Sequence, residues 1–445
     1  MNLNKSNFFY YFLALLILGY FISGLFFLEN AAGGGNINEL HHHWENFQIF
    51  LNNNFFDAIK LTNGGADIKG MTYDSSRSPL VPIVQAFFLS FFNVSKEFIP
   101  QNLFYFRFIV FLISLVTPFL FYLCLKKKFT SVEDYLLILL SFSVLLLSPY
   151  FRTSAYWGYA ENYTFISMLL SYYFIFEFIN NKKKIVKIEK KIIYVTLFSS
   201  LCVYFDIKAI IVPILCYYFI CTSLIPRNKK IFTTILYLFF SLPYVYLVYL
   251  WESPIPPAPT FDRGLGNEIF IENVGYSISI IAFYLFPVLF FKVNSFQELK
   301  KVFSKKKIIY FVIISSIYLL CLNLIYSFDA KIFLGKGFLH KFVELFFEDQ
   351  SLKILFTNIG FLISILILFL YIDTILDLFI ILFFIFISLV SSWLQQEYFD
   401  PIMLLLIFTF FSTKIFIDNK KVLFLTAYQF VFLVGSILYY LRTLD

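Results

Sequence analysis

The sequence predicts an all-α fold, a polytopic helical membrane protein with about 13 transmembrane helices. Of its 445 residues, 60% are hydrophobic and only 14% are charged, which is more apolar surface than a soluble domain of this length can bury. Apolar runs of about 17–22 residues recur from end to end, and a helix of this length crosses a bilayer. The runs do not alternate between apolar and polar residues as the strands of a membrane β-barrel do.

Run length places the predicted spans. They are 8–28, 102–125, 132–148, 160–180, 191–205, 207–225, 231–251, 273–292, 308–327, 353–372, 375–392, 401–417 and 422–441. The N-terminal run is too long for a typical signal peptide and lacks a small-residue cleavage site, so we expect it to be retained as the first helix. No internal repeat is evident, and we expect a single integral-membrane domain over residues 1–445.

Short basic clusters between the spans indicate which loops face the cytoplasm. The clusters begin at Lys126, Lys182, Arg227, Lys300 and Lys420. All five fall on one side if residues 80–93 do not cross the membrane, so we expect a non-crossing or re-entrant segment over 80–100. The loops that then share the outer side are 29–79, 149–159, the turn at 206, 252–272, 328–352 and 393–400.

The formal charge of +7 does not indicate a nucleic-acid partner, because the lysines lie in short loops where they signal topology. The five cysteines all lie within apolar runs and show no metal-ligand spacing. We therefore expect neither a disulfide framework nor a cysteine metal site. Nothing in the sequence supports a divalent metal, and metal dependence stays open.

The longest polar interval follows the first span, and we expect residues 29–100 to form an outer loop with interfacial helices and an active-site carboxylate. Glu39 lies just past the membrane exit and can serve as a general base toward a sugar hydroxyl. The alternative is an ordinary acid at a helix N-terminus. His41, His42 and His43 follow, and three consecutive residues of a helix cannot all face one ion. We assign His42 to orienting Glu39 or an acceptor, with surface histidines as the simpler alternative.

A second polar stretch joins two predicted spans on the outer side, over residues 148–162. Arg152 is a planar, permanent cation suited to a phosphate. Trp157 and the neighbouring tyrosines offer flat faces for sugar rings. An aromatic belt with a snorkelling arginine is the alternative, and it accounts for the aromatics better than for the pair of Arg152 and Glu161.

The remaining outer-side cations complete a candidate phosphate-binding set. They are Arg77, Arg107, Lys208, Arg263, Lys336 and His340. Arg107 is the most informative, because an arginine inside an apolar run must pair or face a polar cavity. Its partner is either a lipid phosphate or a carboxylate such as Glu39 or Asp206. Lys208 stands two residues after Asp206, so these two can also pair with each other.

Three late segments carry local predictions. Four prolines exclude a helix from the start of the loop over 252–272. Residues 338–349 have apolar side chains at helical spacing, which predicts an interfacial amphipathic helix. Asp400 before Pro401 predicts the start of a helix.

The order of these motifs resembles the integral-membrane glycosyltransferases of the GT-C type, and most closely the dolichyl-phosphate-glucose α-1,2-glucosyltransferase group with its bacterial relatives. The matching segments are Asn38-Glu39-Leu40-His41-His42, Ser78-Pro79-Leu80, Pro149-Tyr150 through Asn162, Trp251 with Pro256-Pro257, and Tyr398-Phe399 before Pro401. The sequence departs from the group's pattern at Asn38, at Asp206-Ile207 and at Glu397, where the group has an acid, an Arg-Gln pair and an arginine. Only Glu39 can therefore carry over as the base.

The resemblance implies a donor, a mechanism and a location. A polyprenyl-phosphate-linked sugar would be the donor, and a glycan, lipid or protein the acceptor. Glu39 would take the acceptor's proton, the anomeric configuration would invert, and the cationic set with Trp157, Glu161 and Trp251 would bind substrate. No cofactor is implied. The chain would lie in a bacterial inner membrane with its active site toward the periplasm or outside.

Two other functional classes fit the same pattern of outer-side cations and many spans. A transporter or flippase of lipid-linked saccharides would more often show internal symmetry and charged residues near mid-membrane, and the sequence shows little of either. An O-antigen-type polymerase would also carry arginines in its outer loops. A transporter should tolerate Glu39→Gln, whereas the transferase should not.

Overall fold

The computed structural model describes residues 5–32, 37–63, 79–91, 100–180, 187–251, 269–292, 305–325, 335–389 and 394–442. Throughout these ranges the regular elements are helices and none is a strand. Internal packing divides the chain into two units, which are described separately. Unit 1 comprises Met1–Thr260 with Gln429–Asp445, and unit 2 comprises Phe261–Tyr428.

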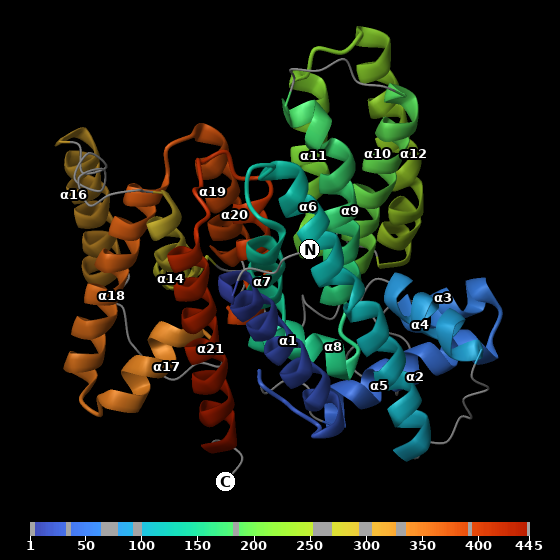
Figure 1. Ribbon diagram of the computed structural model, residues 1–445, viewed down its shortest axis with the longest axis horizontal. Coiled ribbons are helices and arrows are strands. Elements are labelled where there is room, and N and C mark those ends of the chain that lie inside the picture. The colour runs from blue at the N-terminus through green and yellow to red at the C-terminus, as the bar shows by residue number, and fades with distance from the viewer. Residues whose placement is uncertain are drawn as a thin grey trace. The chain divides into compact units, whose positions relative to one another are not determined.

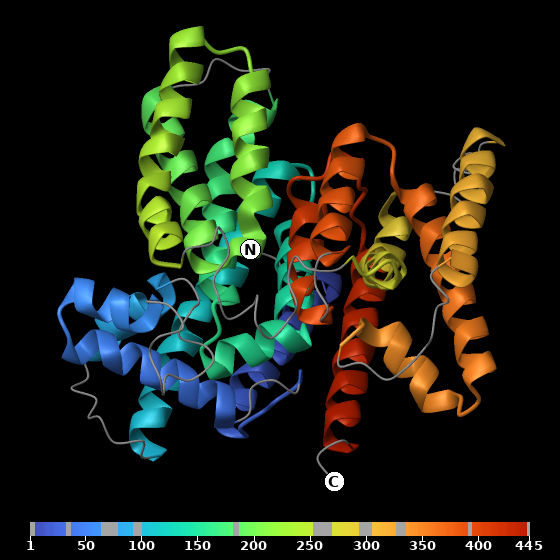
Figure 2. The same cartoon turned by 180° about the vertical axis from the view of Figure 1, so that it is seen from behind.

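Unit 1 contains a bundle of long helices and a group of short ones. Its helices are α1 (Lys5–Phe26), α2 (Ile37–Asn52), α3 (Phe55–Asn63), α4 (Leu80–Ser90), α5 (Pro100–Ser114), α6 (Val116–Lys128), α7 (Asp134–Leu145), α8 (Pro149–Trp157), α9 (Glu161–Asn180), α10 (Ile188–Phe205), η1 (Ile207–Ile210), α11 (Ile211–Thr222) and α12 (Arg227–Trp251). The helices α9 to α12 stand side by side, and α2, α3 and α4 lie across one end of them (Figures 1 and 2).

The short helix α8 owes its position to two terminal residues. The Ser148 hydroxyl accepts a hydrogen bond from the Phe151 amide at 3.0 Å, which caps the N-terminus. Gly158 ends the helix at φ +88°, a conformation that favours glycine. The chain bends by 73° between α7 and α8. As a result α8 departs from the axis of α7, and nearly all of its side chains are buried.

Helices α2 and α3, which follow α1 in the chain, are fixed to the bundle by aromatic and aliphatic contacts. Trp44 and Phe47 of α2 are buried, and the Phe47 ring stacks on Phe106 of α5 with centroids 5.4 Å apart. Ile59 of α3 packs against Trp251 at the end of α12. Residues predicted to form an interfacial loop are therefore helical and packed against the long helices.

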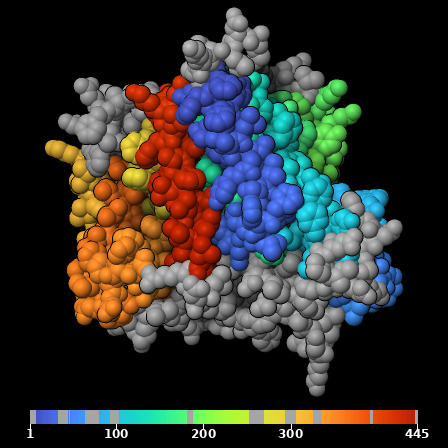
Figure 3. Space-filling model, turned by 60° about the horizontal axis from the view of Figure 1, so that its bottom comes forward, coloured from blue at the N-terminus to red at the C-terminus, as the bar shows by residue number. Residues whose placement is uncertain are grey.

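The first and last helices also meet within unit 1. The Ser436 hydroxyl of α21 (Asn419–Arg442) donates a hydrogen bond to the Ala31 carbonyl at 2.6 Å. Figure 3 shows α1 in blue and α21 in red side by side. The boundary between the two units falls inside α21, so only its C-terminal part, from Gln429, belongs to unit 1.

Unit 2 is arranged around one buried helix. Its elements are α14 (Glu272–Lys292), α16 (Lys305–Leu320), the π turn η2 (Cys321–Ile325), α17 (Gly337–Phe346), α18 (Gln350–Tyr371), α19 (Ile375–Leu389), η3 (Gln396–Tyr398), α20 (Ile402–Phe408) and the start of α21. Helix α14 contacts α17, α18, α19 and α20 and buries most of its side chains. Gly275 permits the contact with α18, since a β-carbon there would lie 2.5 Å from the Phe361 ring.

Seven described helices are long and apolar enough to cross a membrane, and the bent pair α7–α8 would make an eighth. This is compatible with a multi-pass membrane protein, but the predicted count of 13 is not reached. The five predicted spans that fall short correspond to α9, α10, η1 with α11, α19, and α20. Some of these helices are short, and α10 begins with the charged residues Glu189, Lys190 and Lys191.

The prediction that residues 401–417 form one continuous spanning helix is wrong. Helix α20 has seven residues and rises only about 10 Å, against a hydrocarbon thickness of about 30 Å. The buried Asp377 carboxylate accepts hydrogen bonds from the amides of Ser412 at 2.7 Å and Thr413 at 3.0 Å. These bonds hold the following segment in a non-helical path, which the run of apolar residues did not reveal.

Three other segments have the local structure that their sequences suggest. Helix α4 has 11 residues, rises about 16 Å, and is too short to cross a bilayer alone. The amphipathic segment over 338–349 forms α17, with Leu339 and Val343 buried and Phe342 exposed. Helix α20 starts at Ile402, directly after Pro401.

We predict that Trp251→Ala destabilises unit 1 by about 3–5 kcal/mol, because it leaves a cavity between α12 and Ile59 of α3. Unfolding of the detergent-solubilised protein by heat or by sodium dodecyl sulfate measures the change. Tyr249→Ala is the matched control, since Tyr249 lies on the same helix and is 77% exposed. Equal midpoints for the two variants would contradict the packing role of Trp251.

Candidate functional site

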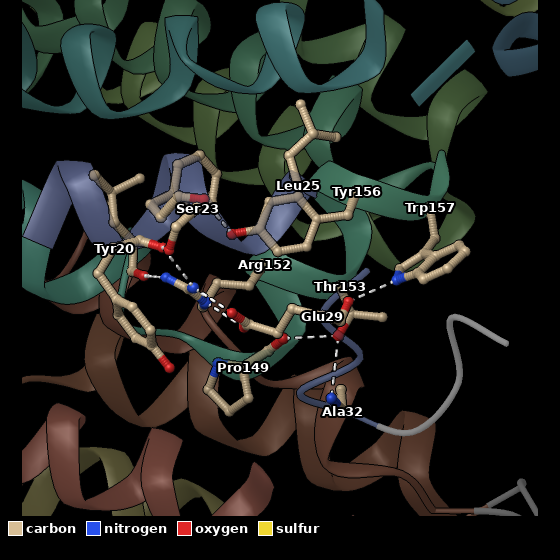
Figure 4. A network of polar contacts seen from close by, with 12 residues as sticks. Tyr20, Ser23, Leu25, Glu29, Ala32, Pro149, Arg152, Thr153, Tyr156 and Trp157 are labelled. Atoms are coloured by element: carbon tan, nitrogen blue, oxygen red, sulfur yellow. Dashed lines mark hydrogen bonds and ion pairs between the residues drawn. The ribbon is translucent and has the colours of Figure 1, made fainter. Parts of the chain in front are cut away.

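A buried ion pair joins the end of α1 to α8 (Figure 4). Arg152 is fully buried, and its Nε and Nη2 atoms donate to the two carboxylate oxygens of Glu29 at 2.5 Å each. This two-point geometry is the strongest arrangement available to an arginine and a carboxylate. The Glu29 side chain is 12% exposed, so solvent screens the pair only weakly.

The rest of the Arg152 guanidinium is also occupied by groups of the same chain. Nη1 donates to the Leu146 carbonyl at 2.9 Å, and Nη2 also donates to the Tyr20 carbonyl at 3.2 Å. The Tyr20 ring lies 4.3 Å from the guanidinium carbon, a cation–π contact. A phosphate could reach this arginine only by displacing Glu29 or backbone carbonyls.

Arg107 forms the second half of the same network. Its Nε donates to the Tyr156 carbonyl at 2.9 Å, and its Nη2 donates to the Leu25 carbonyl at 3.0 Å. Its guanidinium stacks on the Trp157 ring at 4.5 Å. The Trp157 indole in turn donates to the Glu29 carbonyl at 2.8 Å. Both arginines therefore bind backbone carbonyls of α1. Arg107 binds Leu25 in the last turn, where a helix has unsatisfied acceptors, and Arg152 binds Tyr20 earlier in the same helix.

The structure thus brings together Arg107, Arg152 and Trp157, three residues that the sequence singled out. It gives the two arginines partners that the sequence did not suggest, namely Glu29 and backbone carbonyls. Sequence reasoning missed Glu29. The signal was available, because Glu29 is the first acid after the first apolar run and lies nearer to the predicted membrane exit than Glu39 does.

A more exposed group of charges joins the start of α9, which follows α8, to the turn between α10 and α11. Lys208 of η1 is 3.4 Å from Asp206 and 3.9 Å from Glu161 at the start of α9. The side chains are 30% exposed for Lys208 and 21% for Glu161, so solvent reaches both. The predicted pair of Asp206 and Lys208 forms, and Glu161 joins it. Of the described cations that the sequence singled out in unit 1, Lys208 is the one that solvent reaches.

Helices α4 and α2 are linked to the turn at Gly158, directly after α8. The Gln85 amide of α4 donates to the Gly158 carbonyl at 2.8 Å. Phe106, on which α2 packs, also lies close to Gly158, where a β-carbon would lie 2.7 Å from the ring. Glu39 and His42 lie on α2, five and two residues before Trp44, and their side chains lie outside the described residues.

The remaining predicted site residues fall elsewhere. Trp251 is buried against α3 and serves as a packing residue in this structure. Arg77 and Arg263 lie outside the described residues. Lys336 belongs to unit 2, where it is buried beside Glu272 at 3.9 Å and stands 5.0 Å from the centre of the Tyr276 ring.

Comparisons with known protein families, with curated proteins and with solved structures found no match for this chain. Within the described ranges, no three His, Cys, Asp or Glu side chains form a group that could hold a metal ion.

We predict that Arg152→Lys destabilises the protein by about 3–5 kcal/mol, because a lysine cannot match the two-point bond and leaves Glu29 buried with an incomplete partner. Unfolding midpoints measure the loss. The double variant Glu29→Gln/Arg152→Met removes both charges and should regain part of the stability. A double variant less stable than Arg152→Lys would argue against the ion pair as the cause.

We also predict that His340 makes unit 2 less stable in mild acid. Burial and the charge of Lys336 lower the pKa of His340 from 6.5 to about 4. Between these two values the unfolded chain binds a proton that the folded chain does not, so stability falls as pH falls. The loss is about 2 kcal/mol between pH 7 and pH 5.

Unfolding midpoints at pH 5, 6 and 7 for the wild type and for His340→Gln provide the measurement. The other three histidines are present in both proteins, so their contributions cancel in the comparison. We expect a flatter dependence on pH for His340→Gln. The same slope in both proteins would show that His340 does not titrate differently on unfolding.

Proposed function

We propose that this protein is a membrane glycosyltransferase of the GT-C type, which moves a sugar from a polyprenyl-phosphate-linked donor to an acceptor hydroxyl. One observation supports the proposal most: the loop after the first span, which carries Glu39, forms helices that pack on the long helices of unit 1. A general base has to be held in a fixed position relative to its substrate, and a helix fastened by buried aromatic side chains meets that need.

The proposed reaction assigns the base to Glu39. Its carboxylate takes the proton of the acceptor hydroxyl as that oxygen forms a bond to the anomeric carbon. The bond between this carbon and the phosphate oxygen breaks, and its electron pair leaves with the polyprenyl phosphate. Because attack and departure occur on opposite faces, the configuration inverts. His42, one turn of α2 from Glu39, is proposed to orient the acceptor.

The phosphate that leaves gains negative charge and requires a cation. We assign Lys208 to this role, because its side chain is 30% exposed, whereas Arg107 and Arg152 are buried and bound to α1. Arg77 and Arg263 remain in the proposed phosphate-binding set. Trp157 and Glu161 complete the substrate side of this region, while Arg107 and Arg152 hold its frame.

The proposal includes a topology and a location. It places the predicted spans other than 401–417 in the membrane, with the loop that carries Glu39 on the outer side of a bacterial inner membrane. The donor brings its own activated sugar, so the reaction needs no nucleotide. The acceptor is a glycan, lipid or protein of the cell envelope.

We predict that Glu39→Gln lowers the rate of sugar transfer by at least 100-fold while donor binding changes less than about threefold, because the amide cannot accept the proton. The assay measures labelled sugar transferred from a polyprenyl-phosphate donor by purified protein in detergent. Glu45→Gln is the control, since Glu45 is an acid of the same helix α2.

The outcomes separate the functional classes. Equal transfer by Glu39→Gln and wild type would keep the enzyme and remove Glu39 as its base. Donor binding without transfer by the wild type would contradict the transferase and favour a transporter of lipid-linked saccharides.

A further inference from the structure

Unit 2 contains a cluster of charged side chains that the proton transfer proposed above does not use. Its members come from three helices at four-residue spacing, which places residues on one helix face. They are Glu272 and Tyr276 on α14, Lys336, His340 and Glu344 at the start of and along α17, and Lys353 on α18.

The members of this cluster contact one another in two groups, one around Tyr276 and one at Glu344. Lys336 Nζ lies 3.9 Å from the Glu272 carboxylate and 5.0 Å from the centre of the Tyr276 ring. The ring of His340 meets that of Tyr276 edge to face, with centroids 5.8 Å apart. Further along α17, Lys353 Nζ donates to the Glu344 carboxylate at 2.7 Å.

An unusual backbone brings Lys336 into the interior. Three consecutive residues are left-handed, with φ of +100° at Gly335, +61° at Lys336 and +74° at Gly337. A β-carbon on Gly335 would lie 2.5 Å from the Leu394 carbonyl oxygen, so this position accepts only glycine without rearrangement. A lysine in the left-handed region is uncommon, and such strain is concentrated at functional sites.

The cluster has no net charge and has acceptors to spare. Two carboxylates face two ammonium groups, and His340 is neutral because burial lowers its pKa to about 4. Within the described part of the chain, Glu272 Oε2 and Glu344 Oε1 are buried and have no hydrogen-bond donor. A buried acceptor without a donor is unfavourable, and a ligand hydroxyl would satisfy it.

The zero net charge and the two acceptor oxygens without donors indicate which kind of ligand fits the cluster. A phosphate would meet two carboxylates in a group that is already neutral, so an anion is disfavoured. A neutral molecule rich in hydroxyl groups can donate to the two free oxygens and accept from ammonium groups. The side chains are more exposed at the Glu344–Lys353 end, 21% and 13%, than at the Glu272–Lys336 end, 10% and 3%. A ligand would therefore enter beside Glu344.

We propose that the cluster of Glu272, Lys336, His340, Glu344 and Lys353 binds the hydroxyl groups of a saccharide. Glu272 Oε2 and Glu344 Oε1 accept hydrogen bonds from the sugar. The further identification of this saccharide with the acceptor glycan rests on the proposed transferase function, but saccharide binding itself does not.

The test measures binding of free glucose, galactose, mannose and N-acetylglucosamine to the purified full-length protein by saturation-transfer NMR, with inorganic phosphate as the anionic comparison. The test variant is Glu272→Gln/Lys336→Gln, which removes one charge of each sign. The control variant is Glu189→Gln/Lys229→Gln, which removes a paired glutamate and lysine of unit 1.

We expect at least one of the sugars to bind the wild type and the control, and to bind the test variant at least 10-fold more weakly. Phosphate should not compete. If the test variant does not fold, Glu344→Gln serves instead, because Glu344 lies at the exposed end of the cluster. No sugar bound by the wild type, equal binding by the test variant, or competition by phosphate would each overturn the proposal.

The transfer assay separates two claims. One is that the cluster binds a saccharide, and the other is that the protein is a transferase for which this saccharide is the acceptor. A wild type that binds a sugar at the cluster but transfers none contradicts the transferase and leaves the saccharide site standing. A wild type that transfers sugar, with an acceptor KM unchanged in Glu272→Gln/Lys336→Gln, overturns the identification of the bound saccharide with the acceptor and leaves the transferase.

Discussion

The pair of Glu29 and Arg152 sets the constraint on which the rest of unit 1 depends. A guanidinium in a fully buried position is tolerated only when a carboxylate and carbonyls replace its water. Glu29, just after α1, supplies the carboxylate, and Tyr20 of α1 and Leu146 at the end of α7 supply the carbonyls. This requirement fixes α1 relative to α8. Arg107 binds the Leu25 carbonyl in the last turn of α1, and Trp157 joins the Glu29 carbonyl to the end of α8.

Much of the helical architecture was predictable from hydrophobic run length, because a buried or membrane-facing helix needs an apolar surface over most of its length. A described helix lies in each predicted span, and the amphipathic pattern over 338–349 identifies α17. The pattern could not show where helices stop inside an apolar run. The stop after Phe408 depends on Asp377, which is distant in sequence. The break between α5 and α6 at Leu115 lies three residues before Pro118, a proline that hydrophobic run length alone does not take into account.

The candidate site was predictable in its residue types but not in its pairings. Arg107, Arg152, Glu161 and Lys208 were all recognisable as charges that need partners near apolar runs. Which partner each takes depends on tertiary contacts. Four hydrogen-bond partners of the two arginines are backbone carbonyls, which every sequence position carries. Lys336 shows the same limit, because its burial beside Glu272 follows from a left-handed backbone that only the neighbouring glycines hinted at.

Phe106 packs between two parts of unit 1, helix α2 and the turn that follows α8. Its ring lies close to Gly158 and stacks on Phe47 of α2. The turn after α8 and the helix that bears Glu39 therefore share a single aromatic surface. Any β-carbon at position 158 would push this ring, and the ring would displace α2. Variation at a residue that carries no reactive group would thus be transmitted to a carboxylate on another helix, and selection for the placement of α2 would act on a glycine.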